Sequence, residues 1–91
     1  MAVTVKLPTQ LRDAAGGATS AQVDGATVGE VLAALYAEHG ELRSRMADDD
    51  GALRRFVNVY LAGEDIRFLD GLDTPVADGA ELTVLPAVAG G

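Results

Sequence analysis

Two glycines at the end of the chain, Gly90 and Gly91, form the part of the sequence best suited to take part in chemistry. Because glycine has no Cβ atom, this pair can enter a slot too narrow for other residues and carry the terminal carboxylate to a partner's reactive centre. From Leu85 to Gly91 the extended chain reaches roughly 20 Å, which is deep enough for a buried active site. The residues expected to thread the same channel are uncharged and no larger than valine: Ala87, Val88 and Ala89.

The same tail also has a simpler interpretation. Chain ends are often rich in alanine and glycine because disordered termini are under little structural constraint. Two terminal glycines lose much conformational entropy on ordering, so we expect residues 87–91 to be a flexible tail on a domain of residues 1–86. The tail alone fits both interpretations, and the preceding residues have to separate them.

Composition limits the class of protein. With 91 residues, of which 48% are hydrophobic, the chain can build one domain with one modest core. It has no cysteine, which excludes disulfides, thiolate metal sites and thiol chemistry on a side chain. The net charge of −7 argues against binding to nucleic acid or an anionic membrane and favours a basic groove on a partner. We find no spanning segment or signal peptide, so we expect a cytoplasmic protein.

Alternation of apolar and polar residues predicts strands over residues 2–7, 56–61 and 81–85, each with one face in the core. A short strand ending near Val23 should pair antiparallel with the first one, across a loose loop that includes residues 14–17. A tight turn at residues 62–65 should lead into another short strand containing Ile66 and Phe68.

One long helix is predicted to begin after Thr27, because Thr27 and Glu30 have the spacing of a capping box. Gly40 is expected to end this helix in a left-handed conformation. Leu42 and Met46 are compatible with a short second helix or a turn. The apolar stripe of the long helix follows the helical period: Val28, Val31, Leu32, Leu35 and Tyr36.

This order of elements predicts an α+β domain with a mixed sheet of four to five strands and one main helix on one face. If the first and last strands are parallel neighbours in the middle of the sheet, the fold is a ubiquitin-like β-grasp.

Three other groups of residues are weaker candidates for a site. His39 lacks a serine or cysteine partner and is better explained as a neighbour of the helix dipole. Gly16-Gly17 lacks the lysine and the spacing of a phosphate-binding loop. Residues 48–50 are three aspartates, but they fail the alternating ligand spacing of a calcium loop, so we expect a solvated loop and no metal site.

Phe56 and Tyr60 are candidates for a partner-binding surface. If Val57, Val59 and Leu61 point into the core, the two aromatic residues face outward or toward the sheet edge. Aromatic rings commonly mark contact surfaces there. The alternative, that Phe56 closes one end of the core, stays open from the sequence.

The strand order and the terminal diglycine together resemble the ubiquitin-like sulfur carriers. This family includes the small subunit of molybdopterin synthase, the thiazole-biosynthesis carrier and the cysteine-biosynthesis carrier. The resemblance covers essentially the whole chain and is most specific at residues 55–60 and from Ala77 to Gly91, where a turn, a strand, a proline and the diglycine follow one another. Residues 63–68 and the Pro-Ala-Val-Ala-Gly-Gly ending are most similar to the cysteine-biosynthesis carriers.

The resemblance implies that Gly91 carries the sulfur and that the chain is a protein cosubstrate, with no catalytic residue and no bound cofactor of its own. Its carboxylate, for which the ordinary pKa of a chain end is about 3.3–3.7, is ionised at neutral pH and a poor electrophile. In this family, an enzyme related to ubiquitin-activating enzymes uses ATP and magnesium to make the acyl-adenylate. Sulfur then displaces AMP, and a cysteine-synthase-like or other sulfur-incorporating enzyme accepts sulfur from the resulting thiocarboxylate.

Three alternatives remain open at this point. The chain could be the small subunit of molybdopterin synthase, which inserts the same tail into a large subunit. It could be a protein modifier, in which Gly91 forms an amide with a target lysine. It could also be a noncovalent binding module whose tail is incidental.

Overall fold

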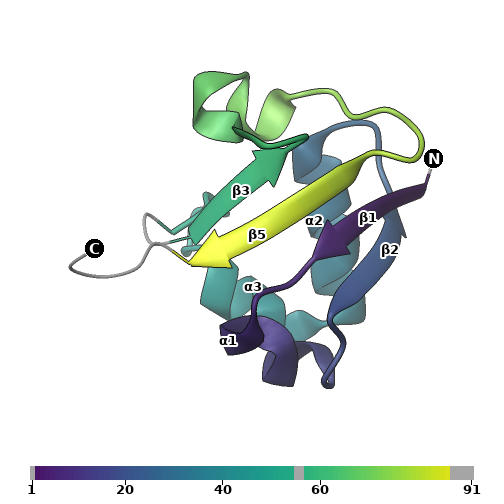
Figure 1. The fold of residues 1–91 in the computed structure, drawn as a ribbon. Helices are drawn as coiled ribbons and strands as arrows, with labels where there is room; N and C mark the ends of the chain where they lie inside the picture. The colour runs from purple at the N-terminus through teal and green to yellow at the C-terminus, as the bar shows by residue number, and fades with distance from the viewer. Residues whose placement is uncertain (1, 55–56, 87–91) are drawn as a thin grey trace.

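A computed structural model describes residues 2–54 and 57–86 and shows a twisted sheet covered on one face by helices (Figure 1). Within these residues the sheet has five strands in the order β2-β1-β5-β3-β4. The strands are β1 (Ala2–Lys6), β2 (Ser20–Asp24), β3 (Val57–Leu61), β4 (Glu64–Asp65) and β5 (Glu81–Pro86).

The first and last strands lie side by side at the centre of the sheet. β1 runs parallel to β5, with Val5 opposite Leu82, while β2 and β3 pair antiparallel with β1 and β5 on either side. The mixed sheet and the central parallel pair confirm the predicted α+β, ubiquitin-like β-grasp fold.

The long helix α2 (Val28–Glu38) begins where the capping box predicts. The Thr27 hydroxyl accepts a hydrogen bond from the Glu30 backbone N–H at 3.2 Å. The Glu30 carboxylate accepts from the backbone N–H of Ala26 at 3.0 Å, one residue before the cap. The Thr27 hydroxyl therefore satisfies a backbone donor that the first helical turn leaves without a partner, and the Glu30 carboxylate holds the residue that precedes the cap.

The predicted end of this helix is confirmed to within one residue, but the left-handed conformation predicted for Gly40 is wrong. α2 ends at Glu38, His39 leaves the helical conformation with φ −132° and ψ 81°, and Gly40 begins the next helix α3 (Gly40–Met46). The physical reason is burial, because Leu42 and Met46 are both 0% exposed and the chain must turn back over the sheet to place them in the core.

The loose loop predicted after the first strand is also wrong. The segment forms a short helix α1 (Thr9–Arg12) and a 3₁₀ turn η1 (Asp13–Ala15), and Gly16 ends it with a φ of +67°. Leu11, Ala14 and Ala15 are buried in the core. Their i, i+3, i+4 spacing is a helical signal that the neighbouring glycines obscured.

A third correction concerns residues 66–68. Ala62 and Gly63 form a tight turn with φ of +52° and +86°, and β4 then contains only two residues. The Asp65 carboxylate accepts from the backbone N–H of Arg67 at 2.9 Å, which bends the chain into the 3₁₀ turn η2 (Ile66–Phe68) instead of a strand. A further 3₁₀ turn, η3 (Gly71–Asp73), precedes β5.

The core lies between the helices and the inner face of the sheet. On α2 the predicted stripe is confirmed, since Val28, Val31, Leu32 and Leu35 are at most 2% exposed. Tyr36 lies at the edge of this stripe, and burial raises its pKa to about 12 although the nearby Arg43 acts in the opposite direction. Among the described residues, no helix has the length and apolarity needed to cross a membrane.

The three aspartates at residues 48–50 are not equivalent. The Asp48 carboxylate accepts from the backbone N–H of Asp50 at 2.9 Å and from that of Ala52 at 3.1 Å, so one side chain organises the turn. In the part of the chain that the structure describes, no three His, Cys, Asp or Glu residues are placed to hold a metal ion.

Replacing Asp48 by alanine is therefore expected to lower the free energy of unfolding by about 1–2 kcal/mol, because two backbone donors lose a charged acceptor. Asp49→Ala is the matched control, since the exposed Asp49 side chain caps nothing in this turn. Urea unfolding of the two variants measures the difference, and equal stabilities would show that the Asp48 contacts contribute nothing.

Candidate functional site at the root of the C-terminal tail

The residues predicted to carry the chemistry follow directly after β5. The structure describes this strand as far as Pro86, so the predictions for the tail and for the first aromatic residue stay predictions. The residues of these predictions lie outside the described part of the chain: Phe56, Ala87, Val88, Ala89, Gly90 and Gly91.

The structure does describe the base from which the tail begins. β5 is held between two strands, and its inward side chains Leu82 and Val84 are 0% and 1% exposed. Pairing with β1 extends from Glu81 to Thr83, whereas pairing with β3 continues to Pro86, which lies opposite Val57. The root of the tail is therefore fixed by the sheet on its β3 side, and five residues beyond Pro86 can extend about 17 Å.

The outer face of the sheet, opposite the helices, surrounds this root. Leu85 points to that face and is 44% exposed, and its partner on β3 is Asn58. The Arg67 guanidinium donates to the Asn58 side-chain oxygen at 2.8 Å and to the Val57 carbonyl at 3.0 Å. Arg67 thus ties η2 to the first residues of β3, beside the strand that carries the tail.

Sequence reasoning missed this role of Arg67. Its contacts depend on η2 folding back over β3, which the prediction of a strand through Ile66 and Phe68 did not allow. Phe68 itself is 82% exposed, so it adds an aromatic side chain to the surface instead of to the core.

Tyr60 lies on the same outer face as Asn58, as its place in the alternation predicts. It is half-buried and lies opposite Thr83 of β5 and Asp65 of β4. The inward positions Val57 and Val59 are buried, while Leu61 at the end of the strand is only partly buried. The orientation of Tyr60 is confirmed, and its contact with a partner stays a prediction.

The other candidate residues are placed apart from the tail root. His39 lies at the junction between α2 and α3, in the helical layer. Gly16 and Gly17 follow η1 with positive φ values of 67° and 88°, and the turn interpretation explains both conformations. What the arrangement offers is therefore a strand held in the middle of the sheet, β5, from which residues 87–91 continue.

Comparison with known proteins shows the family to which this chain belongs, and the similarity extends over nearly its full length. Residues 5–91 match the sequence model of the ThiS family. The chain is 47% identical over 93 aligned positions to the sulfur carrier protein CysO of Mycobacterium tuberculosis, with 100% of both chains covered. It is 42% identical to small archaeal modifier protein 1 of Haloferax volcanii, over 94% of this chain and 97% of the relative.

Solved structures agree with the fold. A chain of the crystal structure of the BexX/CysO complex from Amycolatopsis orientalis superposes with a TM-score of 0.89 at 46% identity, covering 98% of this chain and 99% of that one. The crystal structure of the small archaeal modifier protein SAMP1 from Haloferax volcanii gives a TM-score of 0.86 at 37% identity, with 100% of both chains covered.

Proposed function

Because the chain belongs to the ThiS family, we propose that it is a sulfur carrier protein whose Gly91 carboxylate becomes a thiocarboxylate that donates sulfur in the biosynthesis of cysteine or another sulfur metabolite. The observation that carries this proposal is the similarity to the sulfur carrier protein CysO over the full length of both chains. The geometry supports it, since β5 anchors the root of the diglycine tail at the centre of the sheet.

The conversion needs two steps, and both belong to a partner enzyme. A Gly91 carboxylate oxygen attacks the α-phosphorus of ATP, and pyrophosphate leaves to give the acyl-adenylate, with magnesium neutralising the phosphate charge. Sulfide then attacks the Gly91 carbonyl carbon, the new C–S bond forms, and the C–O bond to AMP breaks. One oxygen of the carboxylate is replaced by sulfur, and no electrons are gained or lost.

In this scheme the chain is a carrier and not an enzyme. Its β-grasp domain is the surface that partners recognise, and its tail brings the reacting group to them. Two kinds of partner follow from the chemistry, namely an adenylating and sulfur-transferring enzyme related to ubiquitin-activating enzymes, and a biosynthetic enzyme that accepts the sulfur. The first would use ATP and magnesium, so the carrier needs no bound cofactor.

The test is incubation with ATP, magnesium, sulfide and an adenylating enzyme, followed by intact-mass measurement. We expect a gain of about 16 Da that maps to the last peptide, because one oxygen is exchanged for sulfur. Oxidation of a methionine adds nearly the same mass, but it needs no ATP and would map elsewhere. An unchanged mass with every adenylating enzyme tried would contradict the proposal.

The similarity to small archaeal modifier protein 1 favours one second candidate, a protein modifier joined through Gly91 to a target lysine. An amide bond to lysine is stable to thiol reagents, whereas an activated acyl group on sulfur is not. ATP-dependent conjugates of high mass that persist after treatment with a thiol would therefore assign the modifier function.

A further inference from the structure

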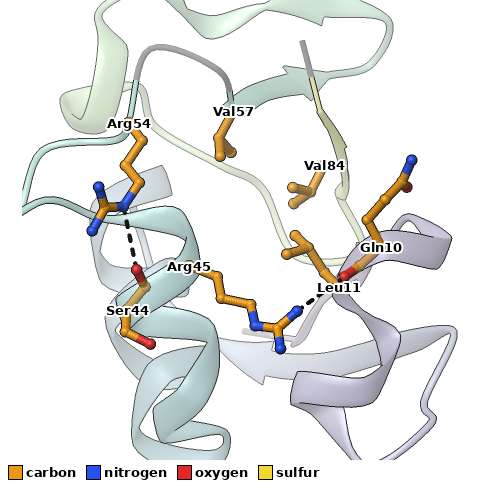
Figure 2. A pocket seen from close by; sticks show the side chains of 7 residues that line it. All are labelled: Gln10, Leu11, Ser44, Arg45, Arg54, Val57 and Val84. Atoms are coloured by element: carbon orange, nitrogen blue, oxygen red, sulfur yellow. Dashed lines mark hydrogen bonds between the residues drawn. The ribbon is translucent and has the colours of Figure 1, made fainter. Parts of the chain in front are cut away.

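A cavity opens beside the root of the tail, on the side of β5 that β1 leaves unpaired. It has a volume of about 480 Å³, and among the described residues it is lined by side chains of α1, α3, β3 and β5 and by Arg54. Figure 2 shows Leu11, Val57 and Val84 pointing toward this space, where they form an apolar floor. The cavity is therefore close to the point at which any enzyme that takes up the tail must contact the domain.

Two arginines form the rim of this cavity. Arg45 of α3 donates one hydrogen bond to the backbone carbonyl of Gln10 at 3.3 Å, and Arg54 donates one to that of Ser44 at 3.2 Å (Figure 2). A guanidinium has five N–H donors, so each has further donors to offer a ligand. Over residues 2–54 and 57–86, neither arginine pairs with a carboxylate, and no Asp or Glu lines the cavity.

This rim has the opposite sign to the protein as a whole. The chain carries 14 acidic and seven basic residues, yet the two charged residues that line the cavity within the described part of the chain are both cations. The overall charge favours a basic partner surface, whereas the rim favours a local acidic group. Such a local reversal of charge favours one orientation of a docked partner, because most other charged side chains of the carrier would repel the same acidic group.

We propose that this cavity is a docking site for an acidic segment of the enzyme that receives the tail. Acidic side chains of that segment pair with Arg45 and with Arg54, and an adjoining aliphatic or aromatic side chain contacts the apolar floor. The inference rests on the proposed function, since it assigns a second contact to the enzyme that acts on Gly91. It adds a recognition element on the helical side of the sheet, distinct from the tail and from the outer face.

The test measures the initial rate of thiocarboxylation as a function of carrier concentration, which gives KM and kcat. The adenylating enzyme used is one that converts the wild-type chain. The double variant Arg45→Gln/Arg54→Gln removes both charges and keeps N–H donors for the carbonyls of Gln10 and Ser44. We expect its KM to rise about tenfold at low salt with kcat within about twofold, since two partly exposed ion pairs are lost before the chemical step. The difference should shrink at high salt, because ionic screening weakens the wild-type pairs.

Two further variants separate docking from general effects. Arg43→Gln removes a charge from the exposed surface of α3 outside the cavity and should leave KM unchanged. Arg45→Lys/Arg54→Lys keeps the charges and should recover most of the affinity, even if the Gln variant proves unstable in thermal unfolding.

The outcomes distinguish the two proposals. A wild-type chain that is never converted overturns the proposed function and this inference with it. A converted wild type with an unchanged KM in both double variants, or an equal rise for Arg43→Gln, overturns only the docking site. A double Gln variant that reacts faster than the wild type would show that the rim holds the carrier's own tail in its resting state, and the partner assignment would be wrong.

Discussion

Replacement of Val84 by aspartate is expected to abolish the cooperative folding of the domain. Val84 lies in the central strand β5, opposite Val59, and its side chain is 1% exposed. An aspartate there would place a carboxylate among the apolar side chains at the floor of the cavity, while Arg45 and Arg54 are held at its rim by the carbonyls of Gln10 and Ser44. The cost of taking such a charge out of water is among the largest effects of a single substitution. Since small domains have a total stability of about 5–15 kcal/mol, we expect most molecules to be unfolded at 25 °C.

The neighbouring residue supplies the control for this experiment. Leu85 follows Val84 in the same strand but points to the outer face, where it is 44% exposed. Leu85→Asp should therefore cost no more than about 1 kcal/mol, as surface substitutions usually do. Circular dichroism and urea unfolding measure both variants, and a stable Val84→Asp protein would mean that the inward and outward faces of β5 have been assigned wrongly.

Replacement of Gly90 by valine is expected to remove sulfur transfer while leaving the domain folded. The proposed function requires the last two residues to pass through a narrow channel, and a branched side chain next to Gly91 would displace the reacting carbonyl. Displacement of a reacting group by about 1 Å can cost roughly 100-fold in rate, so we expect a loss of at least about that size. The measurement is the initial rate of the gain of about 16 Da, with thermal unfolding to confirm that stability is unchanged.

Two further variants show whether the effect belongs to the diglycine. Ala87→Val adds a side chain of the same kind four residues before the end, where we expect a much smaller effect on the rate. Deletion of Gly91 should leave no conversion, because the reacting carboxylate is then one residue short. Normal conversion of Gly90→Val would show that the channel does not require glycine, and would give weight to a noncovalent binding role.

The Val84 and Gly90 variants test separate parts of the molecule. The first acts on the scaffold that fixes the root of the tail, and the second acts on the chain end that the scaffold presents. A carrier needs both parts, whereas a binding module with an incidental tail needs only the scaffold. The pattern of losses therefore discriminates between these two classes of function.

The sequence by itself determined the main strands, the start of α2 and, through the order of these elements, the α+β class, whereas the parallel pairing of β1 with β5 that makes the fold a β-grasp joins the two ends of the chain. The strands and the start of α2 depend on local signals, namely the two-residue alternation in β1, β3 and β5, and the hydrogen bond from the Glu30 N–H to Thr27. The terminal diglycine and the family resemblance supplied the function in the same way, because they also are properties of contiguous residues.

Only the tertiary structure decided the features that depend on contacts between distant residues. α1 and η1 form because Leu11, Ala14 and Ala15 gain burial against the core, although the local glycines favour a loop. Arg67 binds Val57 and Asn58 only because η2 folds back over β3. At the rim of the cavity, Arg45 donates a hydrogen bond to the carbonyl of Gln10, which lies 35 residues earlier in the chain. No periodicity in the sequence predicts such a pair. Local patterns fix local conformation, whereas the free energy of burial and long-range pairing is gained only when the whole chain has folded.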